Sequence, residues 1–150
     1  MVNLKMAKSS TDTVITTVGD WYEKLPNLPK DARELLVKIT PWVALIFGIL
    51  GVLGGITGLG ILSAVAPVAM MGQTQVLGSG MLAALLMLIS AALLLAAFPG
   101  TRNRKEQGWK FLFWSEVVSV VAAVLGFSIG GVLFSLIGLY LVFQIRSYYK

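Results

Sequence analysis

One acidic side chain lies inside the long apolar part of this sequence, and it is the residue best suited to chemistry there. Glu116 is the only ionisable residue in that part away from its edges. A charged group in a bilayer is expensive to bury, so such a residue is a functional candidate by default. If the chain folds back at residues 128–129, Glu116 comes level with residue 141, close to Tyr140 and Gln144. Their hydroxyl and amide groups could hydrogen-bond to a carboxyl group, and the site could then bind a proton or a cation.

A structural role for Glu116 is the alternative, and it is the one that the sequence favours. Counted from Trp109, Glu116 lies roughly 10 Å along a helix. Its carboxylate could therefore turn toward the basic loop, to Arg102 or Arg104. An exposed ion pair of this kind contributes within about 1 kcal/mol.

The composition excludes most other site chemistry. The chain has no cysteine and no histidine, which removes disulfides, thiolate chemistry and nearly all zinc, copper and haem sites. No pair of carboxylates lies in the apolar segments either. We therefore expect no metal, no cofactor and no enzymatic activity.

A glycine-rich stretch at residues 47–62, "FGILGVLGGITGLGIL", includes a possible phosphate-binding motif at 58–63, "GLGILS". A dinucleotide fingerprint needs a preceding strand and an acidic residue about 20 positions later. Here the glycines lie inside an apolar segment, and no acidic residue occurs between Glu34 and Glu106. The pattern therefore favours helix packing over phosphate binding.

Small residues recur at helical spacing in the apolar segments, on what would be one face of each helix. In membranes such residues allow helix backbones to approach closely. The expected packing residues are Ala44, Gly48, Gly51, Gly55 and Gly58 in the first segment, Ser115, Ser119, Ala122 and Gly126 in the third, and Gly131, Ser135 and Gly138 in the fourth.

Four apolar segments predict the fold. Hydrophobic residues make up 57% of the 150 residues and charged residues 13%, and a helix of about 20 apolar residues spans a bilayer. We expect Pro99 and Gly100 to end the second helix, and "GFSIGG" at 126–131 to form the last turn. The sequence thus predicts an all-α integral membrane four-helix bundle, with helices at about 42–66, 80–98, 109–127 and 129–147.

Residues 1–40 form a polar leader ahead of this transmembrane domain of residues 41–150. Apolar residues at helical spacing predict two short amphipathic helices, at 9–25 and 30–39, with Ser9 and Asp12 as a capping box. We expect the leader to be cytosolic or to lie on the membrane surface, and possible roles include binding a partner. It lacks the apolar core of a signal peptide, so the first span is expected to serve as the insertion signal.

The basic residues predict the orientation. All twelve lysines and arginines lie in the leader, in residues 102–110 or in the tail from 146, and the other two connections carry no charge. By the positive-inside rule, both ends of the chain and the middle loop are then cytoplasmic. The net charge of +5 is explained by membrane orientation, and no nucleic-acid partner is expected.

The stretches "RELLVKITPWVALIFGILGVLGG", "AFPGTRNRKEQGWKFLFWSE" and "FQIRSYYK" resemble small uncharacterised four-helix proteins of the bacterial inner membrane. That resemblance implies no activity and no site residues. Small multidrug-resistance transporters also have four short helices and one membrane carboxylate, but in that family the acid lies in the first helix, which here has none.

The expected function is therefore a non-enzymatic packing, assembly or scaffold component of a membrane complex. Its partners would be the lipid bilayer and other membrane proteins or a second copy of the chain. The alternative is a small proton- or cation-coupled transporter or channel that uses Glu116.

Overall fold

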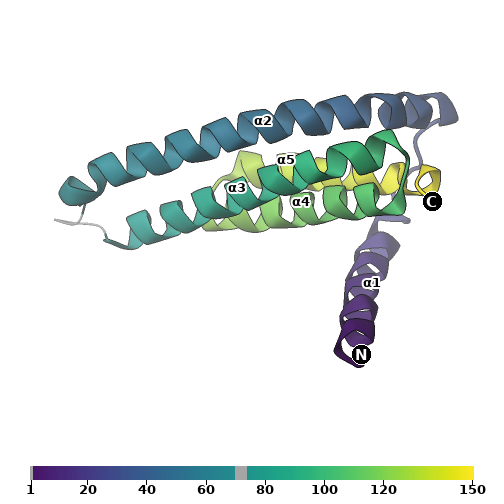
Figure 1. Cartoon of the computed structure of the whole chain (residues 1–150), viewed down its shortest axis with the longest axis horizontal. Helices are drawn as coiled ribbons and strands as arrows, with labels where there is room; N and C mark the ends of the chain where they lie inside the picture. Colours follow the sequence, from purple (N-terminus) through teal and green to yellow (C-terminus); the bar gives the residue numbers. More distant parts are fainter. Residues whose placement is uncertain (1, 70–73) are drawn as a thin grey trace.

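A computed structural model describes residues 2–69 and 74–150 of the chain, and within those ranges it is helical, with no strand. Three helices are long and apolar enough to cross a membrane, namely α2, α3 and α4, whereas α5 is apolar but shorter. The helices are α1 (Val2–Tyr22), α2 (Lys30–Ala69), α3 (Thr74–Arg102), α4 (Glu106–Leu125) and α5 (Ile129–Gln144), followed by the short 3-10 turn η1 (Arg146–Tyr148) (Figure 1). The all-α prediction is confirmed.

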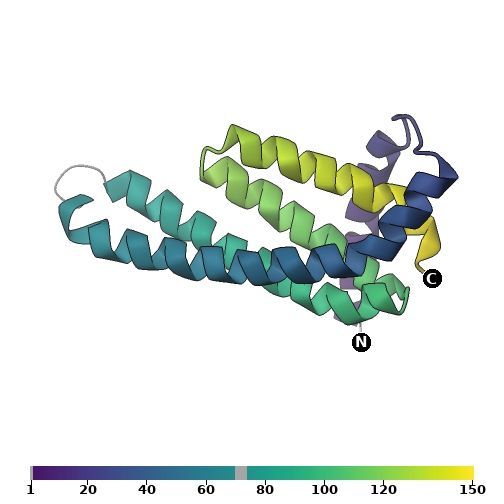
Figure 2. The ribbon, with the colours of Figure 1, turned by 90° about the horizontal axis from the view of Figure 1, so that it is seen from above.

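Helices α2 to α5 run along a common direction, and the α4–α5 hairpin is visibly shorter than the α2–α3 hairpin (Figure 2). Each helix packs mainly on its neighbours in sequence, and the two outer helices, α2 and α5, make few contacts with each other. The predicted four-helix bundle is therefore only partly formed, because its side between α2 and α5 remains open.

Most helix boundaries differ from the sequence expectation by a few residues, and the end of α3 has a clear physical cause. Helix α3 continues through Pro99 and Gly100 to Arg102. A proline inside a helix costs about 3 kcal/mol, and here close packing can offset it. A Cβ added to Gly100 would lie only 2.6 Å from the Cα of Gly108, so the last turn of α3 packs backbone to backbone on the first turn of α4.

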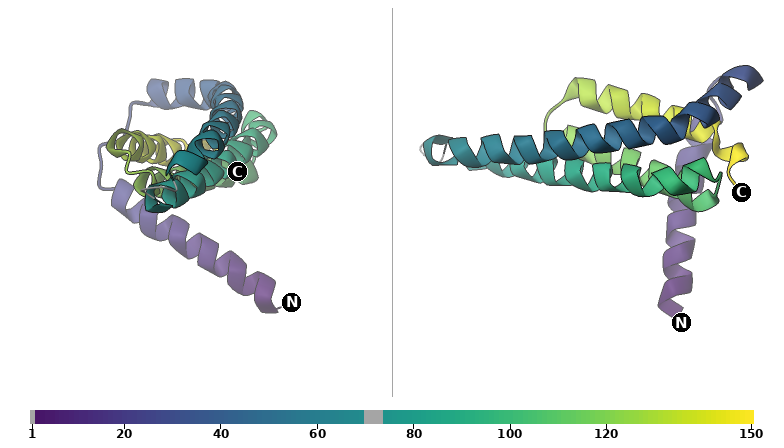
Figure 3. Two further views of the ribbon diagram at one scale, coloured as in Figure 1. Left: turned by 90° about the vertical axis from the view of Figure 1, so that its left-hand side faces the viewer. Right: turned by 45° about the horizontal axis from the view of Figure 1, so that its top comes forward.

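The leader also differs from expectation. Its second predicted helix is the beginning of α2, which continues through Pro41 into the first apolar segment, so the expected boundary at residue 40 falls inside a helix. Its first helix begins at Val2, which places Ser9 and Asp12 inside α1 and excludes the capping box. Helix α1 crosses the direction of the other helices (Figure 3).

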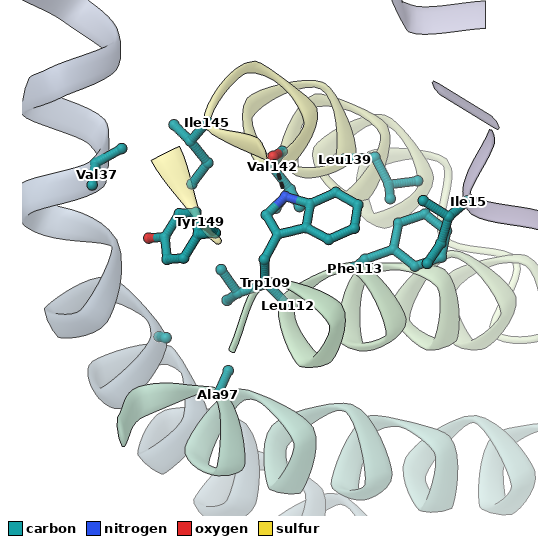
Figure 4. Packing of buried hydrophobic residues seen from close by; sticks show 11 residues of the cluster. Ile15, Val37, Ala97, Trp109, Leu112, Phe113, Leu139, Val142, Ile145 and Tyr149 are labelled. Atoms are coloured by element: carbon teal, nitrogen blue, oxygen red, sulfur yellow. Dashed lines mark hydrogen bonds between the residues drawn. The ribbon is translucent and has the colours of Figure 1, made fainter. Parts of the chain in front are cut away.

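The buried core lies where α1, the start of α2, the end of α3, the start of α4, the end of α5 and the tail meet (Figure 4). At its centre the indole nitrogen of Trp109 donates a 2.7 Å hydrogen bond to the carbonyl of Val142. The Trp109 ring stacks on Phe113, with ring centroids 5.8 Å apart. Ile15 of α1 and Val37 of α2 are buried in the same cluster. Residues 1–40 thus contribute side chains to this core.

The small residues of α2 face α3 over only part of the helix. An added Cβ would lie 2.7 Å from Leu95 at Gly48, 2.8 Å from Ala91 at Gly51 and 2.5 Å from Leu88 at Gly55. At Gly58 it would meet nothing within 4 Å. Gly58 therefore does not face α3 closely, although α2 still approaches α3 further along, where a Cβ added to Gly80 would lie 3.4 Å from Leu62.

The small residues of α4 and α5 serve three different purposes. Ser115 and Ser119 face α3, where Ser90 donates a 2.9 Å hydrogen bond to the Ser115 carbonyl and shares a 2.6 Å bond with the Ser119 hydroxyl. Gly126 ends α4, and the Gly131 N–H donates to the Ser128 hydroxyl that caps α5. Ser135 and Gly138 line a cleft, described below, together with Ala44 of α2, while Ala122 is half-buried.

Replacing Gly51 with leucine should lower the stability of the protein, because the new side chain would overlap Ala91 and push α2 away from α3. Overpacking of this kind typically costs about 1–3 kcal/mol. Gly58→Leu is the matched control in the same helix, since its side chain would enter open space. Thermal unfolding of both variants in detergent measures the difference. Equal melting temperatures would show that Gly51 does not contact α3.

Candidate functional site

A cleft of about 430 Å³ lies between the two outer helices, α2 and α5. It reaches from Leu36 to Gly51 along α2 and from Phe134 to Ile145 along α5, and residues of α3 and α4 complete its lining. The lining is mainly aliphatic and aromatic, and Glu116 is its only charged residue. The open side of the bundle therefore contains the acidic residue singled out by the sequence.

Glu116 is placed in the cleft by the lack of a side chain on α5. A Cβ added to Gly138 would lie 2.6 Å from Oε2 and 2.8 Å from Oε1 of Glu116. The carboxyl group therefore lies directly against the α5 backbone, in space that only glycine leaves free.

Among the side chains that the structure describes, those of residues 10–67 and 78–150, the Glu116 carboxyl group has no hydrogen bond and no ion pair. The ion pairs found there join Lys110 to Asp12 at 3.9 Å and to Glu106 at 2.9 Å. Neither Arg102 nor Arg104 forms an ion pair with Glu116 among the described side chains, so the expected ion pair is not formed. The physical reason is distance and direction, since Glu116 lies about 15 Å along α4 from the basic loop and points at α5.

Tyr140 and Gln144 do not join Glu116 either. The Tyr140 hydroxyl donates a 2.6 Å hydrogen bond to the carbonyl of Pro26. The Gln144 side-chain oxygen accepts a 3.2 Å bond from the Leu28 N–H. Tyr140 is two residues from Gly138, which is roughly 200° around a helix. Both side chains therefore hold the connection between α1 and α2 against α5, and the predicted three-residue site is not assembled.

Two other residues lie close to the acid. Ser135 is one helical turn before Gly138, is only 6% exposed and lines the cleft, and its hydroxyl has no hydrogen bond among the described residues. Burial raises the pKa of the Tyr22 hydroxyl, and the nearby Glu116 carboxylate raises it further. That hydroxyl donates a 3.3 Å bond to the carbonyl of Leu136. Ser135 could be found from its small-residue spacing, whereas no sequence signal links Tyr22 to Glu116.

The site can therefore hold a proton or a cation, with one carboxyl group and one free hydroxyl in an apolar cleft. Across the described residues, no three acidic, histidine or cysteine side chains come together as a metal site would need. The chain matches no known family model, no curated protein and no solved structure. Any functional conclusion rests on this geometry.

Replacing Gly138 with alanine tests the placement of Glu116. In the parent the new methyl group would displace the carboxyl group and lower stability. In a Glu116→Ala background the same change should be neutral or stabilising, because alanine is favoured over glycine in a helix by about 1 kcal/mol. We expect a coupling free energy of about 0.5–3 kcal/mol from chemical unfolding of the four proteins in detergent. Additive effects would place the carboxyl group elsewhere.

Proposed function

We propose that the chain is a non-enzymatic, multi-pass protein of the bacterial inner membrane that binds a proton or a cation at Glu116 and couples this binding to transport. One observation carries the proposal, namely a carboxyl group with no hydrogen bond and no ion pair among the described side chains, in a cleft lined by four apolar helices, of which three are long enough to cross a membrane. An intramembrane acid of this kind is expensive to keep unless it has a function.

The arrangement of the ends supports a cytoplasmic placement of both termini. The Lys150 N–H donates a 3.2 Å hydrogen bond to the carbonyl of Arg104, and Val37, Trp109 and Tyr149 share one buried cluster. Leader, middle loop and tail therefore lie at one end of the molecule, and this end carries the basic residues. The positive-inside rule makes that end cytoplasmic. Helix α5, about 24 Å long, would return the chain to this side across a thin or locally thinned bilayer.

Proteoliposomes test the transport proposal. With a pH-sensitive dye inside and a cation gradient across the membrane, the parent should show flux, and Glu116→Gln should abolish it because glutamine keeps the shape but cannot carry the charge. Glu34→Gln is the matched control, an exposed acid outside the cleft, and should keep the parent rate. Equal flux in the parent and in Glu116→Gln would refute the proposal.

A second candidate is the assembly role that the sequence favours. Gly58 and Gly60 of α2 have no atom near their Cβ positions, and small residues on a membrane helix support close approach of another helix. A partner would be another membrane protein or a second copy of the chain.

Gentle extraction from native membranes tests this assembly role. Here Gly58→Leu should keep the melting temperature of the parent but lose a co-purifying partner or a dimer, because its side chain would block close approach. An unchanged complex would rule out α2 as the contact surface.

A further inference from the structure

The charge of the cleft limits what can occupy it. Among the residues that line it, Glu116 is acidic and none is lysine or arginine. Ser135 adds one hydroxyl without a hydrogen bond among the described residues, a turn away from Gly138 on the same helix. A complementary ligand therefore carries one positive charge. It also has to fit beside the hydroxyl group of Ser135.

The walls of the cleft favour an organic cation over an inorganic one. Ca²⁺ and Mg²⁺ need about six or more oxygen ligands, and one carboxyl group with nearby serines supplies too few. Phe47 of α2 and Phe134 of α5 line the same cleft, with ring centroids 6.3 Å apart. Aromatic faces attract organic ammonium groups, so these rings and Glu116 suit the same ligand.

The size and the position of the cleft define the ligand further. A volume of about 430 Å³ lies within the range of sites for small organic molecules. The cleft opens between α2 and α5, where the exposed side chains of Ile39 and Val43 form part of its lining. On helices that span a membrane this opening faces lipid, so the ligand reaches the site from the bilayer and must be hydrophobic.

We propose that the cleft binds a hydrophobic organic ammonium ion with a single positive charge. Its ammonium head group lies against Glu116 and Ser135 and near the rings of Phe47 and Phe134, and its apolar body lies along the aliphatic side chains of α2 and α5. This inference rests on the proposed binding of a cation at Glu116, and it adds the class of cation and the path by which it arrives.

Calorimetric titration of the purified full chain in detergent with benzyltrimethylammonium tests the inference. This probe keeps its charge at every pH. We expect saturable binding that Glu116→Gln weakens about tenfold or more and Phe134→Leu weakens about threefold. Glu34→Gln should bind like the parent. Equal melting temperatures of parent and variants would exclude unfolding as the cause.

The outcomes separate this inference from the proposed function. The inference is overturned if the parent shows no saturable binding, or if Glu116→Gln binds the probe as tightly as the parent. If Glu116-dependent flux is nevertheless present, the site is one for protons or inorganic cations. Equally tight binding of neopentylbenzene, the uncharged analogue of the probe, also overturns it, because the cleft would then be a simple apolar pocket. Charge-dependent binding without flux supports the inference and refutes transport.

Discussion

Close approach of backbones around α3 is the contact on which the rest of the structure depends. Lipid offers helices little hydrophobic gain on association, so contact between backbones has to hold them together. Helix α3 is held on two sides: its side chains Leu95, Ala91 and Leu88 lie against Gly48, Gly51 and Gly55 of α2, and its Gly100 crosses Gly108 of α4 backbone to backbone. Helix α5 packs mainly on α4 alone. The open side of the bundle follows from this unequal distribution of small residues.

Glu116 faces a cleft because the bundle is open between α2 and α5. In a closed bundle the acid would have been covered by apolar side chains or paired with a polar group from a neighbouring helix. Here it lies between the bare α5 backbone at Gly138 and a cleft. The α4–α5 hairpin covers one side of the Glu116 carboxyl group and leaves the other side facing the cleft. A ligand in the cleft can therefore contact the carboxyl group.

The sequence was sufficient for the helical class, for the apolar segments and for the position of Glu116 within one of them, because length and hydropathy act locally. It was insufficient for the partners of that residue. Counting from a fold-back at 128–129 places Glu116 opposite residue 141, but the turn is centred on Phe127, whose positive φ of 51° reverses the chain earlier. Glu116 therefore lies opposite Gly138. The bonds of Tyr140 to Pro26 and of Leu28 to Gln144 join residues more than a hundred positions apart, and no local pattern encodes them.

Those two bonds have a mechanical consequence. They fasten the connection between α1 and α2 to α5, while α2 itself forms the opposite wall of the cleft. Because α2 begins directly after this connection, the two walls of the cleft are joined at one end through a single short segment, residues 23–29. A wider separation of α2 and α5 at that end would therefore have to break or shift both hydrogen bonds.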